Sequence, residues 1–152
     1  MSFLVSRESP DTKDASALIA ELQAELEPLY AAKSRHGYSV EKLLQTGVAF
    51  FVAREDGVPA GCGGIQLFGT EYGELKRMYV RPAHRGRGCA KAVFDALAGH
   101  ARSNGVTLLR LETGIYQTAA IAFYEREGFR QIPPFGPYWD DPVSRCYELR
   151  LP

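Results

Sequence analysis

The sequence predicts an α/β fold built on one mixed sheet, antiparallel at first and with at least one parallel crossover. A content of 45% hydrophobic and 24% charged residues is that of an ordinary globular protein. A turn signal at residues 55–57 separates two strand-like runs and indicates an antiparallel hairpin. Helix and strand patterns then alternate in the second half of the chain, which favours a parallel crossover. The length of 152 residues matches one domain, so we expect residues 1–152 to form a single domain.

The first half of the chain is expected to form a short strand, two helices and three further strands. Apolar residues recur at helical spacing from Ala15 to Leu26, which predicts a helix that Pro28 ends. Ser39 is a suitable N-cap for a second, short helix, which Gly47 ends. The expected elements are a strand at 3–5, helices at 14–27 and 39–44, and strands at 48–54, 60–68 and 74–80.

The second half is expected to alternate helices and strands. Apolar residues from Ala90 to Ala101 recur on one face of a predicted helix, and Asn104 with Gly105 is a suitable C-terminal stop. The next run is rich in leucine, as a buried strand would be. The expected elements are a helix at 87–102, a strand at 106–112, a helix at 118–127, a strand at 129–132, a proline-rich loop at 133–142 and a strand at 144–149.

Composition limits the classes of partner. Eighteen basic and eighteen acidic residues give a formal net charge of zero, which disfavours nucleic acid. Cys62, Cys89 and Cys146 show no pairing pattern, which argues against a disulfide framework and a metal site and fits a reducing compartment. The first residues lack a signal-peptide pattern, and no apolar run approaches the ~20 residues that cross a membrane. We therefore expect a cytoplasmic protein with no membrane, nucleic-acid or metal partner; exposed strand edges would allow a homodimer.

The most informative segment runs from Glu74 to Ala90, where a predicted strand leads through a glycine- and arginine-rich turn into a helix. The first amides of a helix have no partner within it, and the helix dipole places about +0.5 charge there. Glycines allow close approach of a phosphate, and Arg85 and Arg87 add charge, so the turn favours anion binding. An ordinary turn with solubilising arginines is the alternative. The P-loop pattern is absent, and Lys91 stands where the dinucleotide fingerprint requires its third glycine.

A family resemblance is carried first by this turn, Arg85-Gly86-Arg87-Gly88-Cys89-Ala90. It resembles the acyl-CoA pyrophosphate loop of the GNAT superfamily of N-acetyltransferases, Arg/Gln-x-x-Gly-x-Gly/Ala. The preceding strand, residues 75–82, and the segment 120–129, a helix that carries a tyrosine and ends in Gly-Phe, are similar to the neighbouring family motifs. The loop alone is a modest signal, but the three motifs at this spacing are together specific, and the order of elements agrees over nearly the whole chain.

The resemblance implies a GNAT-like mixed, mostly antiparallel sheet with a central splayed parallel strand pair and helices on both faces. It implies an N-acetyltransferase in which acetyl-CoA is the donor and the primary amine of a small molecule or amino acid attacks it directly. A peptide or protein lysine as acceptor and a longer acyl-CoA as donor stay open as alternatives. A non-catalytic CoA-binding sensor module is an alternative of another class.

The resemblance also implies how the donor would be held. The amides of residues 85–91 would cradle the pyrophosphate, and the pantetheine arm would pair with exposed backbone of residues 78–80. Cys89 replaces an aliphatic family residue, and we interpret it as a small hydrophobe rather than a nucleophile. Gln117 stands near a family asparagine that contacts CoA. The residues expected to bind the cofactor are Met78, Tyr79, Val80, Arg85, Gly86, Arg87, Gly88, Cys89, Ala90, Lys91, Gln117, Ala120 and Phe123.

Two catalytic residues are implied by the same resemblance. Tyr124 matches the tyrosine that protonates the departing thiolate, and its alternative is a core aromatic on the apolar face of its helix. Glu74 stands where several family members carry a general base, and its alternative is a solvated charge at a strand end. Strand alternation would place Lys76 and Met78 on the same face as Glu74.

The acceptor site in the family lies between the region joining the first two helices and the loop before the last strand. Four residues are therefore expected to contact the acceptor, with loop packing as the alternative for each: His36, Tyr38, Tyr138 and Trp139. Aromatic side chains there would suit an acceptor with an apolar or planar part.

Overall fold

The structure, a computed structural model that describes residues 2–152, contains one seven-stranded sheet. The strands are β1 (Leu4–Arg7), β2 (Ala49–Glu55), β3 (Val58–Phe68), β4 (Tyr72–Val80), β5 (Leu108–Gly114), β6 (Arg130–Ile132) and β7 (Ser144–Arg150). The helices are α1 (Lys13–Leu26), α2 (Val40–Gln45), α3 (Cys89–Ser103) and α4 (Thr118–Arg126), and three short 3-10 turns are η1 (Ala32–Ser34), η2 (Pro82–His84) and η3 (Gly136–Tyr138). The predicted order of strands and helices is confirmed.

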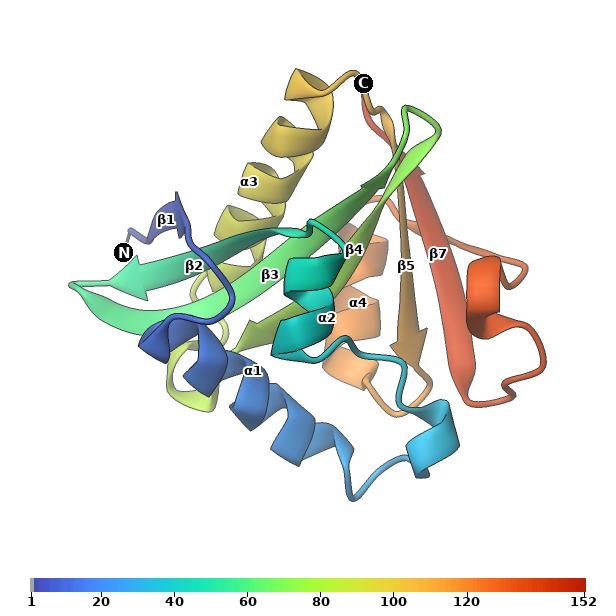
Figure 1. Cartoon of the computed structure of the whole chain (residues 1–152), viewed down its shortest axis with the longest axis horizontal. Coiled ribbons are helices and arrows are strands. Elements are labelled where there is room, and N and C mark those ends of the chain that lie inside the picture. Colours follow the sequence, from blue (N-terminus) through green and yellow to red (C-terminus); the bar gives the residue numbers. More distant parts are fainter. Residues whose placement is uncertain (1) are drawn as a thin grey trace.

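The sheet has the order β1-β2-β3-β4-β5-β7-β6, and every neighbouring pair is antiparallel except β4 and β5. These two strands pair only at Gly73 with Leu109 and at Glu74 with Arg110. Beyond that point they diverge, as Figure 1 shows. The predicted central, splayed parallel pair is therefore confirmed, and it leaves the second half of β4 without a strand partner on that side.

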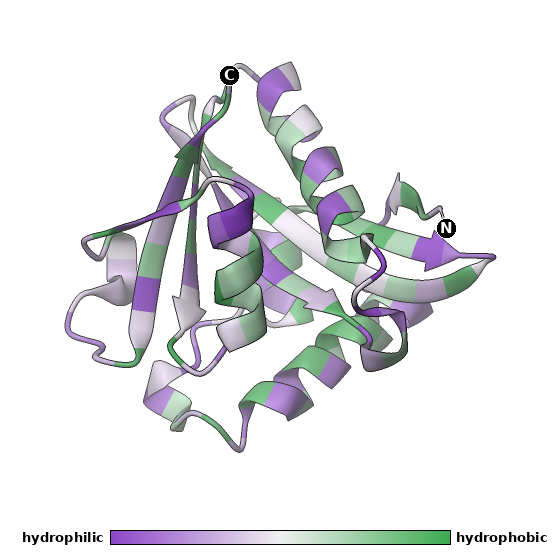
Figure 2. Cartoon of the chain, turned by 180° about the vertical axis from the view of Figure 1, so that it is seen from behind, coloured by the Kyte–Doolittle hydropathy of each residue, from purple (hydrophilic) through white to green (hydrophobic). Residues whose placement is uncertain are grey.

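Helices cover both faces of the sheet, as predicted. The helices α1 and α2 lie on one face and α3 and α4 on the other, as the views from the two sides in Figures 1 and 2 show. Under α3 and α4 the core includes fully buried Val93, Leu97 and Leu109, and under α1 it includes Leu18 and Phe50. Burial of one such side chain stabilises the fold by about 1.5–3 kcal/mol, so the apolar helix faces hold both layers on the sheet.

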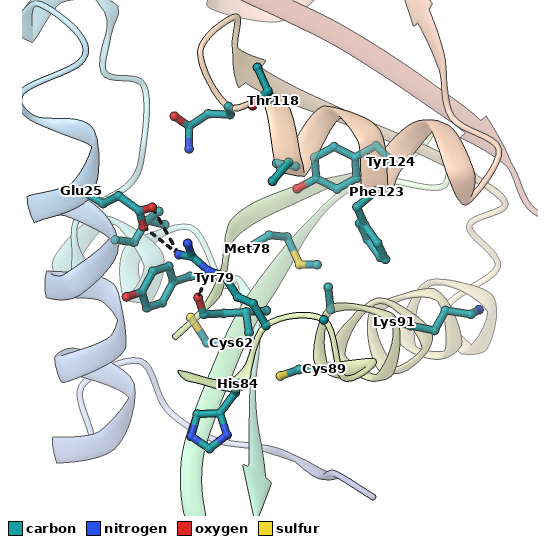
Figure 3. Close-up of a pocket in the computed structure, with 18 of the residues that line it drawn as sticks. Glu25, Cys62, Met78, Tyr79, His84, Cys89, Lys91, Thr118, Phe123 and Tyr124 are labelled. Carbon is teal, nitrogen blue, oxygen red and sulfur yellow. Dashed lines mark hydrogen bonds and ion pairs between the residues drawn. The ribbon is translucent and has the colours of Figure 1, made fainter. Parts of the chain in front are cut away.

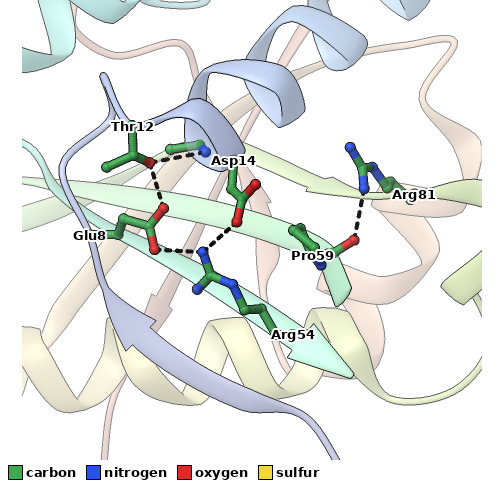
Figure 4. A network of polar contacts seen from close by, with 7 residues as sticks. Glu8, Thr12, Asp14, Arg54, Pro59 and Arg81 are labelled. Atoms are coloured by element: carbon green, nitrogen blue, oxygen red, sulfur yellow. Dashed lines mark hydrogen bonds and ion pairs between the residues drawn. The ribbon is translucent and has the colours of Figure 1, made fainter. Parts of the chain in front are cut away.

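A polar network fixes the start of α1 over the hairpin of β2 and β3 (Figure 4). Arg54 on β2 donates to Glu8 at 2.8 Å and to Asp14 at 2.9 Å, and Thr12 caps the helix by accepting from the Ala15 amide. The strand β3 begins two residues earlier than predicted because Pro59 is accommodated where the β2–β3 register shifts.

A bulge in β4 overturns the predicted alternation of its side chains. Gly64 opposes Lys76 and Cys62 opposes Tyr79, so β4 holds one extra residue in between. Arg77 has a positive φ of 54°, and a Cβ on Gly63 would collide with Met78 and Val93 of α3. Met78 therefore lies on the α3 face, opposite to Glu74 and Lys76, because a bulge inverts the alternation that follows it.

Candidate functional site

A cavity of about 710 Å³ lies where β4 leaves β5, between the end of β4, the start of α3, α1 and α4 (Figure 3). Twelve of the thirteen residues predicted to bind the cofactor line it, and Arg87 does not. Tyr124 lines it as well, together with residues that sequence reasoning did not single out, such as Leu22 and Glu25 of α1. The structure thus brings together the turn, the strand and the helix on which the resemblance rests.

The start of α3 forms one end of this cavity. The helix begins at Cys89, two residues later than predicted, because Gly86 and Gly88 adopt positive φ values of 75° and 90° that a helix does not contain. Its internal bonding starts where the Ala92 amide donates to the Gly88 carbonyl at 3.1 Å. The amides of residues 89–91 precede that bond and have no acceptor within the helix, which makes them donors for an anion.

The two arginines of the turn differ in their surroundings. The Arg85 guanidinium donates to the Val80 carbonyl at 2.9 Å and pairs with Glu25 at 3.2 Å, at the wall of the cavity. Arg87 instead pairs at 3.1 Å with Glu55, which also contacts His84 at 3.0 Å. The structure therefore places Arg85 with the other predicted ligands and leaves Arg87 beside the buried Glu55.

The backbone of β4 presents different residues to β3 and to the splay. The Arg81 amide donates to the Ala60 carbonyl at 2.8 Å. Because hydrogen-bonded pairs alternate in an antiparallel ladder, Tyr79 also directs its backbone groups to β3, and Val80 directs its groups to the splay. The Val80 amide, rather than that of Tyr79, is thus directed toward a ligand in the cavity, while the Val80 carbonyl accepts from Arg85.

Tyr124 stands on α4, and its hydroxyl is turned toward the cavity (Figure 3). Its ring also packs edge-on against Phe129 at 5.6 Å, so the alternative role as a core aromatic is met by the same residue. Burial raises the pKa of the Tyr124 hydroxyl above its usual value, and the negative charge of Glu112 raises it further. The phenol therefore keeps its proton at neutral pH and can donate it.

A buried polar cluster lies on the opposite face of the sheet. The Glu74 carboxylate accepts from Lys76 Nζ at 2.8 Å and from the Tyr138 hydroxyl at 2.5 Å, and only 3% of Glu74 is exposed. Lys76 Nζ also lies 3.9 Å from the centre of the Tyr38 ring. Glu74 is thus a buried, hydrogen-bonded carboxylate and not a solvated charge at a strand end, and Tyr38 and Tyr138 belong to its cluster.

Glu112 on β5 is a residue that sequence reasoning missed. The last pair between the parallel strands β4 and β5 is Glu74 with Arg110. Two residues further along each strand, where the strands begin to diverge, Lys76 on β4 is opposite Glu112 on β5. The Ser144 hydroxyl donates to Glu112 Oε2 at 2.7 Å. Burial raises the pKa of the Glu112 carboxyl, and the Ser144 bond and the nearby His36 oppose that shift. The sequence signal that could have identified Glu112 is an acidic residue inside a leucine-rich strand.

A second cavity, of about 480 Å³, lies beside the segment that joins α1 to α2 and the loop before β7. His36 and Trp139 line it, as do Tyr30 and Asp141. His36 Nε2 contacts Asp141 Oδ2 at 2.7 Å. Leu29 and Tyr116 line both cavities, so the second adjoins the first. Of the four predicted acceptor residues, the structure places two in this cavity and two around Glu74.

The three cysteines are free and buried. Burial raises the pKa of Cys89 to about 11, so this thiol stays protonated at neutral pH, which suits a small hydrophobe better than a nucleophile. Within residues 2–152, no group of three or more His, Cys, Asp or Glu side chains is arranged to hold a metal ion. In the same part of the chain, no helix has the length and apolar character that membrane crossing requires.

Comparison with known proteins gives consistent matches. The model of the acetyltransferase (GNAT) family matches residues 16–129. The chain is 42% identical over 149 residues to an IAA acetyltransferase of Azospirillum brasilense, covering 97% of each chain. It is 37% identical to a Klebsiella pneumoniae protein classed as an acyl-CoA N-acyltransferase, whose crystal structure superposes with a TM-score of 0.83 and coverage of 98% and 97%. A Thermoplasma acidophilum N-acetyltransferase crystallised with coenzyme A shares the fold at 20% identity, with a TM-score of 0.76 and 99% coverage of both chains.

Proposed function

The chain belongs to the acetyltransferase (GNAT) family, and we propose that it transfers an acetyl group from acetyl-CoA directly to the primary amine of a small molecule or amino acid. One observation carries this proposal: at the splay of β4 from β5, one cavity contains both the unpaired amides at the start of α3 and the phenol of Tyr124, and Glu112 on β5 lies near enough to act electrostatically on that phenol. The Azospirillum relative, by its name, acts on a small molecule, which supports such an acceptor over a protein lysine.

The first cavity fits acetyl-CoA, which supplies the acetyl group as a thioester. The unpaired amides of residues 89–91 and the Arg85 guanidinium would hold the pyrophosphate. The backbone of Val80 would hold the pantetheine arm at the free edge of β4. The Arg85 guanidinium would leave Glu25 and bind the phosphate instead. Breaking the pair with Glu25 costs little free energy, because both side chains are well exposed.

Two carboxylates stand close enough to the splay to accept the proton of the acceptor ammonium. Glu74, the base expected from the resemblance, is neutralised by Lys76 and hydrogen-bonded by Tyr138. Glu112 has one oxygen on Ser144, and no hydrogen bond from the described residues reaches the other, Oε1. We assign the proton-accepting step to Glu112. Glu74 would instead hold Lys76 and Tyr138 in position. Tyr124 then protonates the departing thiolate.

The test is the Tyr124→Phe variant, assayed by release of the CoA thiol. Loss of the acid should lower kcat by roughly 10²–10⁴-fold while acetyl-CoA affinity stays the same, because the ring remains in place. Tyr147→Phe is the matched control, since the Tyr147 hydroxyl is buried and has no hydrogen-bond partner in the described structure. An unchanged kcat in Tyr124→Phe would reject its role as acid. A wild type that binds acetyl-CoA but releases no thiol with any amine would instead indicate a sensor module.

A further inference from the structure

The second cavity has uncovered aromatic side chains at its rim. Tyr116 is 55% exposed and Trp139 is 63% exposed, although both line the cavity. Tyr30 lies behind Tyr116, with ring centres 5.5 Å apart. Large, well-exposed aromatic side chains in the lining of a concave site are typical of a ligand-binding pocket. An aromatic ligand in this cavity would bury apolar surface of Tyr116 and Trp139.

The charges around this cavity favour a cation over an anion. Asp140 and Asp141 line it, against Lys33 and His36. His36 lies on Asp141, so its contact is already made to a carboxylate. Glu112 does not line this cavity, but its carboxyl interacts electrostatically with two residues that do, His36 and Asp141. With the paired His36 and Asp141 set aside, the carboxylates of Asp140 and Glu112 outnumber the one ammonium of Lys33, so an ammonium on the ligand is favoured over a carboxylate.

The position of the cavity relates these two properties to the reaction. It shares Leu29 and Tyr116 with the cofactor cavity, and His36 in its lining is an electrostatic neighbour of Glu112 at the splay. A ligand that stacks its ring at the rim and extends its ammonium inward would therefore direct the nitrogen toward Glu112.

We propose that the acceptor is an arylalkylamine, an aromatic amine without a carboxylate, with its ring between Tyr116 and Trp139 and its nitrogen toward Glu112. This inference rests on the proposed function. The bond from the amine nitrogen to the acetyl carbon forms and the carbon–sulfur bond breaks. Of the two protons that the ammonium loses, one passes to Glu112 and then to solvent, and the other replaces the proton that Tyr124 gives to the thiolate.

The experiment measures thiol release from acetyl-CoA with matched acceptors. Phenylethylamine and tryptamine are compared with phenylalanine and tryptophan, which add a carboxylate, and with hexylamine and spermidine, which lack the ring. We expect kcat/KM for the arylalkylamines to exceed that for the amino acids by about 100-fold, because the carboxylate would meet like charges. We expect it to exceed that for hexylamine by about tenfold, because the ring contacts are lost.

The Trp139→Ala variant tests the ring contact. Because Trp139 is largely exposed, its removal leaves the fold intact, and KM for phenylethylamine should rise about tenfold while KM for hexylamine stays unchanged. Leu4→Ala, at the exposed edge strand, is the control. This inference alone would be overturned if kcat/KM for the amino acids or for spermidine equalled or exceeded that for the arylalkylamines. It would also be overturned if Trp139→Ala left KM for phenylethylamine unchanged. If none of these amines causes release of the thiol from acetyl-CoA, the proposed function is overturned, and this inference with it.

Discussion

At the scale of single residues, Glu112, to which we assign the proton-accepting step, carries a cost in stability. Its carboxyl is partly buried in the sheet, and burial raises its pKa, so ionisation at neutral pH costs the folded state free energy. Around it stand His36 on the α1–α2 segment, Asp141 on the loop before β7, Glu74 and Lys76 on β4, and Tyr124 on α4. The Ser144 hydrogen bond and the nearby His36 offset this cost only in part, because the pKa of the carboxyl is still raised.

The Glu112→Gln variant should therefore be more stable and less active. A carboxyl whose pKa is raised by folding contributes stability that is present below its unfolded pKa and lost as the pH rises through its folded pKa. Glu112→Gln should thus melt at a higher temperature than wild type at pH 7, and the two should converge near pH 4.

Activity completes this test. Glu112→Gln should lower kcat/KM by roughly 10²–10⁴-fold, and Glu74→Gln should lower it less. The stability control is Glu148→Gln, which loses contacts to Arg110 and Arg130 and should not melt higher. A larger loss of activity in Glu74→Gln than in Glu112→Gln would return the proton-accepting step to Glu74, the residue that the resemblance implied.

Single residues also show where sequence reasoning succeeds. The turn at 85–91 and Tyr124 belong to contiguous motifs, so a resemblance could identify them. Glu112 belongs to no such motif, and its partners His36 and Asp141 lie far from it in the sequence. Met78 was placed on the wrong face because period-2 alternation holds only in a regular strand, and the bulge at Arg77 breaks it.

At the scale of elements, the β4 bulge connects the sheet to α1 and to the segment that joins α1 to α2. Arg77 Nε donates to the Tyr38 carbonyl at 2.9 Å, and its Nη2 donates to Gln23 of α1 at 2.8 Å. Gly37 allows this approach, because a Cβ there would collide with the Arg77 guanidinium. The bulge thus holds the segment that carries His36 at a fixed place relative to Glu74.

We expect Arg77→Ala to weaken both the fold and acceptor binding. Loss of the two buried hydrogen bonds should cost about 1–3 kcal/mol, or roughly 2–4 °C in Tm for each kcal/mol. KM for the amine should rise more than KM for acetyl-CoA, because the cofactor cavity does not contain Arg77. Arg35→Ala, which removes only a contact to Glu27 at 3.5 Å, is the control. Equal increases in both KM values would show that Arg77 supports the whole fold rather than the acceptor side.

The predicted elements were right in kind and order, and their bounds shifted where local geometry intervened. The strand predicted from residue 106 begins at Leu108, because the Val106 amide closes the end of α3 by donating to Ala101 at 2.9 Å. The three 3-10 turns were not predicted, since runs of three residues carry no periodic signal.

At the scale of the whole molecule, a formal net charge of zero gives the protein no overall charge that would attract acetyl-CoA. Binding must come from the local arrangement at the start of α3 and along the splayed edge of β4. The sequence could predict that arrangement because a family resemblance covered nearly the whole chain. It could not predict the shape of the second cavity, which is lined by three segments far apart in the sequence, residues 29–36, Tyr116 and residues 137–143. The expectations of a cytoplasmic location, a single domain and a homodimer stay predictions.

The central claim is that the first cavity binds acetyl-CoA through the start of α3, and calorimetric titration tests it most directly. Wild type should bind acetyl-CoA with a Kd in the micromolar range, about −8 kcal/mol. Gly88→Glu should abolish binding, because Gly88 has a φ of 90° and the new carboxylate would face the phosphates. Gly99→Glu puts the same charge further along α3 in open space and should bind as wild type does. Equal affinity in wild type and Gly88→Glu, or no binding by wild type at millimolar acetyl-CoA, would contradict the claim.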